Sequence, residues 1–130
     1  IAYKEYAIAD TNEVQSVTTA AAGECDVLYI PTDNTLASVT ETVYNVVAPA
    51  KVPVIAGEEG ICNGCGVATL SISYYDLGYA TGEMAYEILA EGADITTMDV
   101  RYAPNVTKKY NAKICEELGI TVPDDYVAIQ

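Results

Sequence analysis

The sequence contains no histidine, and this absence excludes several familiar catalytic and metal-binding arrangements. A Ser-His-Asp triad, a Cys-His pair and a histidine-ligated metal all need an imidazole. Tryptophan and phenylalanine are also absent, so eleven tyrosines supply all the aromatic surface. Basic residues are scarce, because 6 Lys and Arg oppose 19 Asp and Glu and leave a formal net charge of −13. Such a charge argues against binding to nucleic acid or to an anionic membrane surface.

Long apolar runs are missing as well. No run approaches the ~20 apolar residues that a membrane-spanning helix requires. The 130 residues are 51% hydrophobic, which is enough for one domain with a core. The sequence opens on an apolar, strand-like stretch without an initiator Met, a signal peptide or a lipidation site. We therefore expect it to be a fragment of a longer protein.

Four cysteines are too few and too scattered for a disulfide scaffold. Cys62 and Cys65 form a CxxC pair, but zinc would need a second such pair or histidines. A redox CxxC usually begins a helix, where the dipole lowers the thiol pKa. Here Gly66 and a strand-like run follow instead. We expect a loop pair, free or disulfide-linked, and neither a metal nor another cofactor.

The chain is organised around residues 26–45. An apolar run at 27–30 stops at Pro31, a polar cluster follows, and a helical pattern begins at Leu36. The polar turn thus lies between the carboxyl end of a strand and the start of a helix, where open α/β sheets bind ligands. Two interpretations are open for this turn. Thr32, Asp33 and Asn34 bind a polar small molecule, or Asp33 or Asn34 only caps the helix.

The rest of the sequence alternates between strand and helix patterns. Strands are expected at residues 1–9, 52–56, 67–72, 100–103 and 106–110. Helices are expected at residues 10–22, 77–91 and 111–118, the second buried through Leu77, Met84, Ala85, Ile88 and Leu89. This alternation predicts an α/β fold with a doubly wound, mainly parallel sheet flanked by helices. The runs at 27–30, 52–56 and 67–72 are predicted to be buried, neighbouring strands.

Polar clusters follow two more of these strands. Glu58 and Glu59 come after the strand at 52–56, and Ser73, Tyr74 and Tyr75 come after the strand at 67–72. The carboxyl ends of parallel strands share one edge of a sheet. Convergent polar and aromatic groups without a nucleophile–base pair indicate a binding site rather than an enzyme. For Tyr74 and Tyr75, ordinary packing is the alternative.

Four segments occur in order along nearly the whole chain: DVLYIPTDNTLAS, KVPVIAGEEG, VATLSISYYDLGYATGEMAYEIL and ICEELGITVPDD. Together they resemble the carboxyl-terminal half of ABC-transporter substrate-binding proteins, in the group of tryptophan/tyrosine-type solute receptors with a type I periplasmic-binding-protein fold. The resemblance implies two α/β lobes that close on a ligand. Residues 1–130 resemble the carboxyl-terminal lobe without its first strand and helix. Crossover segments at about 73–103 would return toward the missing lobe.

The resemblance also implies a function. It implies an extracytoplasmic solute-binding component of an ABC importer, a lipoprotein or periplasmic protein, with a permease and an ATPase as partners. The ligand would be a small polar solute, most plausibly an aromatic amino acid. The cleft-lining positions would be Thr32, Asp33, Asn34, Glu58, Glu59, Ser73, Tyr74 and Tyr75.

One position departs from the family pattern. Ser73 stands where members commonly have an acidic residue, so a charge that could pair with a ligand amino group is missing. The effector-binding core of a LacI-type transcription regulator shares the fold and is the alternative function. An amino-terminal lipobox would mark the receptor, and a helix-turn-helix would mark the regulator.

The resemblance has a consequence for the helix that begins at Leu77 and ends at Glu91. In the family this helix packs with the other lobe. In the fragment its apolar stripe would be exposed, and burying each such side chain is worth ~1.5–3 kcal/mol. We therefore expect self-association through this helix, most simply as a dimer. The competing expectation is that the helix folds back onto its own sheet.

Overall fold

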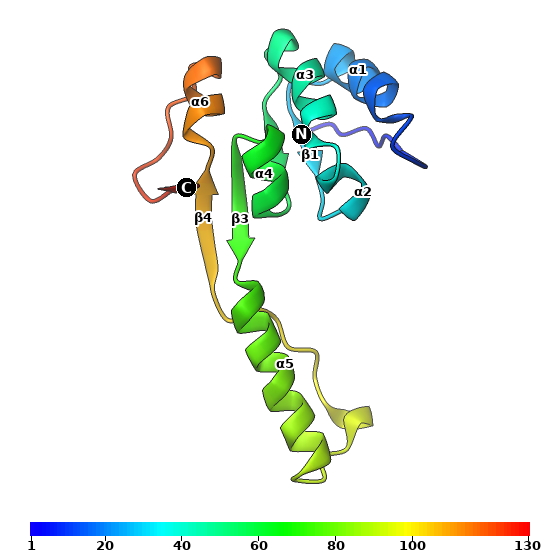
Figure 1. Ribbon diagram of the computed structural model, residues 1–130, viewed down its shortest axis with the longest axis vertical. Coiled ribbons are helices and arrows are strands. Elements are labelled where there is room, and N and C mark those ends of the chain that lie inside the picture. The colour runs from blue at the N-terminus through cyan, green and yellow to red at the C-terminus, as the bar shows by residue number, and fades with distance from the viewer. The chain divides into compact units, whose positions relative to one another are not determined.

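A computed structural model describes all residues from 1 to 130 (Figure 1). The chain divides into two compact units. Unit 1 comprises Ile1–Ser71 and Lys108–Gln130, and unit 2 comprises Ile72–Thr107. None of the helices combines the length and the apolar character that crossing a membrane would require.

A five-stranded sheet in the order β1-β2-β3-β4-β5 forms the framework of the fold. Its strands are β1 (Leu28–Ile30), β2 (Val54–Ala56), β3 (Ala68–Ile72), β4 (Val106–Tyr110) and β5 (Val127–Ala128). The helices of unit 1 are α1 (Val14–Glu24), α2 (Asn34–Ala37), α3 (Thr40–Ala50), α4 (Glu59–Cys65) and α6 (Ala112–Leu118). Unit 2 contains α5 (Tyr74–Leu89) and the short 3-10 helix η1 (Ile95–Thr97).

The sheet is mainly parallel. β1 pairs in parallel with β2, β2 with β3, and β4 with β5. The arrows of β3 and β4 point in opposite directions in Figure 1, so the sheet changes direction between these two strands. The predicted α/β class and the neighbouring arrangement of the three apolar runs are confirmed.

The core lies on one face of the sheet. Val14 of α1, Val43 of α3, Val54 of β2 and Ile61 of α4 belong to one buried cluster. Side chains alternate between the two faces of a strand, and this alternation is visible in the burial. Tyr29, Ile55 and Leu70 retain 68%, 38% and 58% exposure, whereas Ile30, Val54, Ala56, Thr69 and Ser71 are buried. The expectation that these runs are buried throughout is therefore correct for one face only.

Several expected elements differ in the structure. Residues 1–9 and 100–103 form no strand, although a strand is expected at each place. A strand exists only where a neighbour completes its hydrogen bonds. The last strand, β5, was not expected, and it is two residues long. The expected helix at the carboxyl end is confirmed, with Asn111 as its N-cap and Gly119 in the left-handed region at φ 67° as its C-cap.

The CxxC segment is helical rather than a loop. Glu58 caps α4 by accepting hydrogen bonds from main-chain N–H groups of its first turn. Ile61, Cys62 and Cys65 then fall on one buried face, as residues at i, i+1 and i+4 do. α4 contains two glycines, Gly60 and Gly64, and glycine favours a loop over a helix. The cap and the buried face outweigh the ~1 kcal/mol by which each glycine disfavours a helix.

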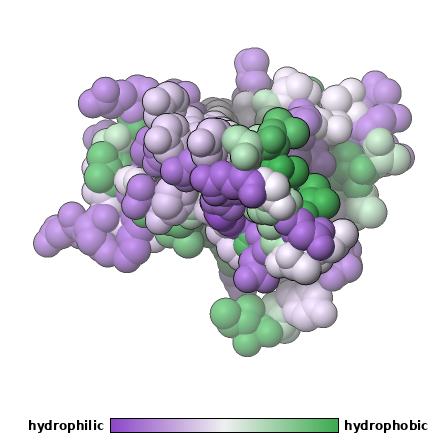
Figure 2. All heavy atoms as spheres, turned by 90° about the horizontal axis from the view of Figure 1, so that it is seen from below, coloured by the Kyte–Doolittle hydropathy of each residue, from purple (hydrophilic) through white to green (hydrophobic).

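Unit 2 has no buried side chain. The prediction that α5 buries Leu77, Met84, Ala85, Ile88 and Leu89 is wrong for this chain, in which Leu89 is 85% exposed and the other four keep partial or full exposure. The return segment of unit 2 contacts α5 through an Arg101–Glu87 ion pair of 2.6 Å and a hydrogen bond of 3.5 Å from Asn105 to Asp76, but it buries no residue of the helix. Large side chains of unit 2 accordingly reach the surface, among them Tyr86, Leu89 and Ile95. Figure 2 shows hydrophobic residues among hydrophilic ones on the face of the molecule that it displays.

Gly64 allows α4 to approach α3 closely. A Cβ placed on Gly64 would lie 2.1 Å from Oγ1 and 2.4 Å from Cβ of Thr40. We predict that Gly64→Ala lowers the free energy of unfolding by about 1–3 kcal/mol, because the two helices must separate. Gly23→Ala is the matched control, since a Cβ there meets nothing within 4 Å. The control should stabilise by up to ~1 kcal/mol.

Urea denaturation followed by far-ultraviolet circular dichroism measures both variants. A Gly64→Ala protein as stable as the Gly23→Ala protein would show that α3 and α4 do not pack this closely.

Candidate ligand-binding site

Two polar turns lie in contact at the carboxyl edge of the parallel strands. The β1 turn (residues 31–34) follows β1, and the β2 turn (residues 57–59) follows β2. The main-chain N–H of Gly57 donates to the carbonyl of Ile30 at 2.7 Å, and Thr32 Oγ1 donates to the carbonyl of Gly57 at 3.3 Å. A Cβ on Gly57 would lie 2.7 Å from the main-chain nitrogen of Thr32. This position therefore requires glycine for the two turns to touch.

Two of the predicted ligand-binding carboxylates cap helices. Asp33 Oδ1 accepts from the main-chain N–H of Leu36 at 2.8 Å, at the start of α2. Glu58 accepts from the main-chain N–H groups of Gly60, at 2.8 Å, and of Ile61, at the start of α4. The capping interpretation of Asp33 is thus correct. It does not exclude binding, because a capping Asp33 still has a second carboxylate oxygen.

The β1 turn offers the more accessible of these groups. Thr32, Asp33 and Asn34 are exposed, whereas Glu58 is partly buried and uses both of its carboxylate oxygens in the cap. A hydroxyl, a carboxylate and an amide side by side can accept hydrogen bonds from a ligand ammonium and donate to a ligand carboxylate. The arrangement favours recognition of a small zwitterion.

Glu59 has different partners. Its Oε2 accepts from Ser71 Oγ at 2.9 Å and from Lys109 Nζ at 2.6 Å. The hydrogen bond from Lys109 holds the pKa of the Glu59 carboxyl below its usual range, with Ser71 adding a smaller effect in the same direction. Sequence reasoning missed Ser71 and Lys109. The alternation of β3 places Ser71 on its buried face, but β4 has no buried residue, so no local pattern in the sequence points to Lys109.

The three remaining predicted residues belong to unit 2. Ser73 caps α5, with its Oγ accepting from the main-chain N–H of Asp76 at 3.1 Å. Tyr74 and Tyr75 open the helix and are 60% and 80% exposed. Their rings are therefore not used for packing within unit 2. They are available to a ligand or to another protein surface.

The two cysteines of the CxxC pair are buried and unreactive as thiolates. All four are free thiols, and Cys62, Cys65 and Cys115 are buried. Burial raises the pKa of Cys62 and of Cys65 to about 12, so both thiols are protonated at neutral pH. No group of three or more His, Cys, Asp or Glu side chains has the geometry to hold a metal ion.

Comparison with known proteins identifies the family. Residues 1–129 match the family model described as ABC transporter substrate binding protein. A tyrosine-binding protein of Clostridioides difficile (strain R20291) is 39% identical over 100 residues, which are 73% of this chain and 29% of that protein.

Solved structures that resemble this chain also include a substrate-binding protein. An ABC domain from Streptococcus pneumonia in complex with L-Trp is 33% identical, with a TM-score of 0.80 over 93% of this chain and 41% of that one. A ligand-free, open substrate-binding protein with adhesive properties from Clostridium difficile is 36% identical, with a TM-score of 0.69 over 95% of this chain and 43% of that one. The chain thus spans less than half the length of these relatives.

The matches support the substrate-binding interpretation and give no support to the LacI-type alternative. Substrate-binding proteins of this kind are not enzymes. Because the family model covers nearly every residue, this chain belongs to the ABC transporter substrate binding protein family.

Proposed function

We propose that these 130 residues form most of the carboxyl-terminal lobe of a two-lobe receptor, which binds an aromatic amino acid for an ABC importer. The observation that carries the proposal is the contact between the β1 and β2 turns at the carboxyl edge of parallel strands. Open α/β sheets bind their ligands at this edge. The relatives include a protein described as tyrosine-binding and a structure in complex with L-Trp, which supports this class of ligand.

The proposed roles follow from the chemistry of each side chain. Asp33 accepts a hydrogen bond from the ligand ammonium through its second carboxylate oxygen, and Thr32 and Asn34 complete the polar contacts. Tyr74 and Tyr75 supply ring area for an aromatic side chain. Glu58 holds the β2 turn in place by capping α4.

The remaining partners follow from the proposed transport role. A receptor of an importer works outside the cytoplasm, and we propose either a lipid-anchored or a periplasmic location. Its protein partners would be the membrane permease and the ATPase of the importer. The net charge of −13 is consistent with a protein that binds no nucleic acid.

The role of Asp33 in binding can be separated from its role as a cap. Serine is about as good an N-cap as aspartate but carries no charge. In the full-length receptor, Asp33→Ser should preserve the unfolding free energy and weaken binding of L-tyrosine or L-tryptophan by ~1–3 kcal/mol. Asp33→Ala should lose both the cap and the ligand contact. Calorimetric titration and urea denaturation give the two readouts. Undiminished affinity in Asp33→Ser would reduce Asp33 to a helix cap.

The 130 residues alone should bind the ligand poorly or not at all. A receptor that closes between two lobes buries most of its ligand, and only one wall of the cleft is present here. Calorimetry with L-tyrosine and L-tryptophan should therefore detect strong binding only for the full-length receptor. Equal affinity for the two proteins would contradict the two-lobe proposal.

The exposed face of α5 is proposed to be a contact surface. Leu77, Met84 and Ile88 are partly exposed, and Leu89 is 85% exposed. An apolar partner that buries these side chains would therefore stabilise unit 2. In the 130-residue chain, the readiest partner is a second copy, as a two-fold dimer.

Light scattering at micromolar concentration should show a dimer of the 130-residue chain. Met84→Glu with Leu89→Glu should return it to a monomer. A wild-type monomer would contradict self-association and leave the competing expectation, in which the helix folds back onto its own sheet.

A further inference from the structure

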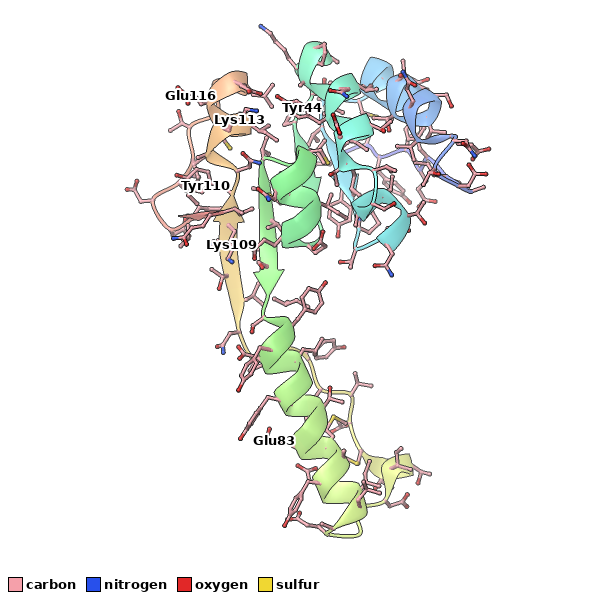
Figure 3. The ribbon with its side chains drawn as sticks, in the orientation of Figure 1. Tyr44, Glu83, Lys109, Tyr110, Lys113 and Glu116 are labelled. Carbon is pink, nitrogen blue, oxygen red and sulfur yellow. The ribbon has the colours of Figure 1, made fainter.

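Glu59 occupies a position that a ligand contact does not explain. It is the first residue of α4 and belongs to the β2 turn. Its Oε2 accepts hydrogen bonds from both Ser71 on β3 and Lys109 on β4. Figure 3 shows Lys109 on β4 with its side chain directed toward β3. One oxygen therefore joins the start of a helix to two neighbouring strands.

The two partners stand where the chain passes between the units. Ser71 is the last residue of unit 1 before the chain enters unit 2, and Lys109 is the second residue after it returns at Lys108. Ser71 is buried, with 5% exposure. The side chains of Lys109 and Glu59 are 28% and 38% exposed. The ion pair is thus partly shielded from water, unlike the Lys113–Glu117 pair, in which Lys113 is 77% exposed.

We propose that Glu59 is a positioning residue of the binding site and not a ligand contact. It holds the β2 turn against the last residues of β3 and the returning part of β4. The β2 turn contacts the β1 turn, so the bond network of Glu59 sets the position of the whole polar edge. This inference rests on the proposed ligand-binding function and reassigns one residue within it.

The chemistry favours this assignment. An ammonium ligand at Oε2 would compete with both Lys109 and Ser71, which already donate to this oxygen. Because Lys109 holds the pKa of Glu59 below its usual range, the carboxylate is charged and paired at neutral pH. A group that is already neutralised adds little attraction for a ligand cation.

Exchanging the charges of Glu59 and Lys109 distinguishes a positioning role of Glu59 from direct contact with the ligand. In the full-length receptor, Glu59→Gln and Lys109→Met should each weaken binding of L-tyrosine and L-tryptophan by roughly threefold to tenfold, because a charge-assisted hydrogen bond is lost. The double variant Glu59→Lys, Lys109→Glu restores an ion pair between the same positions and should recover most of the affinity. Lys113→Met removes the same charge from an exposed pair and should leave affinity unchanged.

The opposite pattern would overturn the proposal. If Glu59 touches the ligand, Lys109→Met leaves affinity equal or higher, and the charge exchange fails to recover what Glu59→Gln loses.

A second measurement tests the positioning role of Glu59 independently of the proposed ligand-binding function. If the wild-type receptor binds neither amino acid, the proposed function fails. The linkage is then tested by hydrogen exchange without ligand. Glu59→Gln and Lys109→Met should each speed exchange in residues 68–72 and 106–110, the charge exchange should slow it again, and Lys113→Met should have no effect. Unchanged exchange in the first two variants would refute the positioning role.

Discussion

Parallel pairing of β1, β2 and β3 is the constraint on which the rest of this structure depends. The register that sets Leu28 beside Val54 and Ile55 beside Ala68 brings the strand ends to one edge. A helix follows each of these strands, and the polar turns that connect strand to helix therefore lie at that edge. The contact between the turns needs a position without a side chain, and Gly57 supplies it. The position of the proposed binding site is thus a consequence of strand direction.

The helix starts at this edge are all capped by side chains. Asp33, Glu58 and Ser73 each accept hydrogen bonds from main-chain N–H groups of the helix that follows. Such caps fix a turn before any ligand arrives. A ligand that meets a prearranged turn loses less of its binding energy to ordering the protein. Capping and binding are therefore compatible roles for one residue, and Asp33 combines them in the function proposed here.

Sequence reasoning predicted the parts that depend on local pattern. The apolar runs before Pro31, around Val54 and around Thr69 are strands because their patterns and boundaries are local. The helix at α6 followed from its cap residues, Asn111 and Gly119. The prediction of a strand at residues 1–9 is wrong because a strand also needs a neighbouring strand for its hydrogen bonds, and a local sequence pattern does not show whether one is present.

The partners of the site residues were beyond sequence reasoning. Glu59 and Lys109 are 50 residues apart in the sequence and meet only because β3 and β4 are neighbours. Two carboxylates next to each other, Glu58 and Glu59, looked equivalent in the sequence. The structure gives one to a helix cap and the other to an ion pair. Only the arrangement of the strands distinguishes them.

The central claim is that the joined β1 and β2 turns form one wall of an amino acid site. Nuclear magnetic resonance of the full-length receptor titrated with L-tyrosine and L-tryptophan tests it most directly. The account predicts that saturable ligand binding shifts the amide resonances of residues 32–34 and 57–58 together, with one dissociation constant. Saturable binding that leaves both turns unshifted would contradict it.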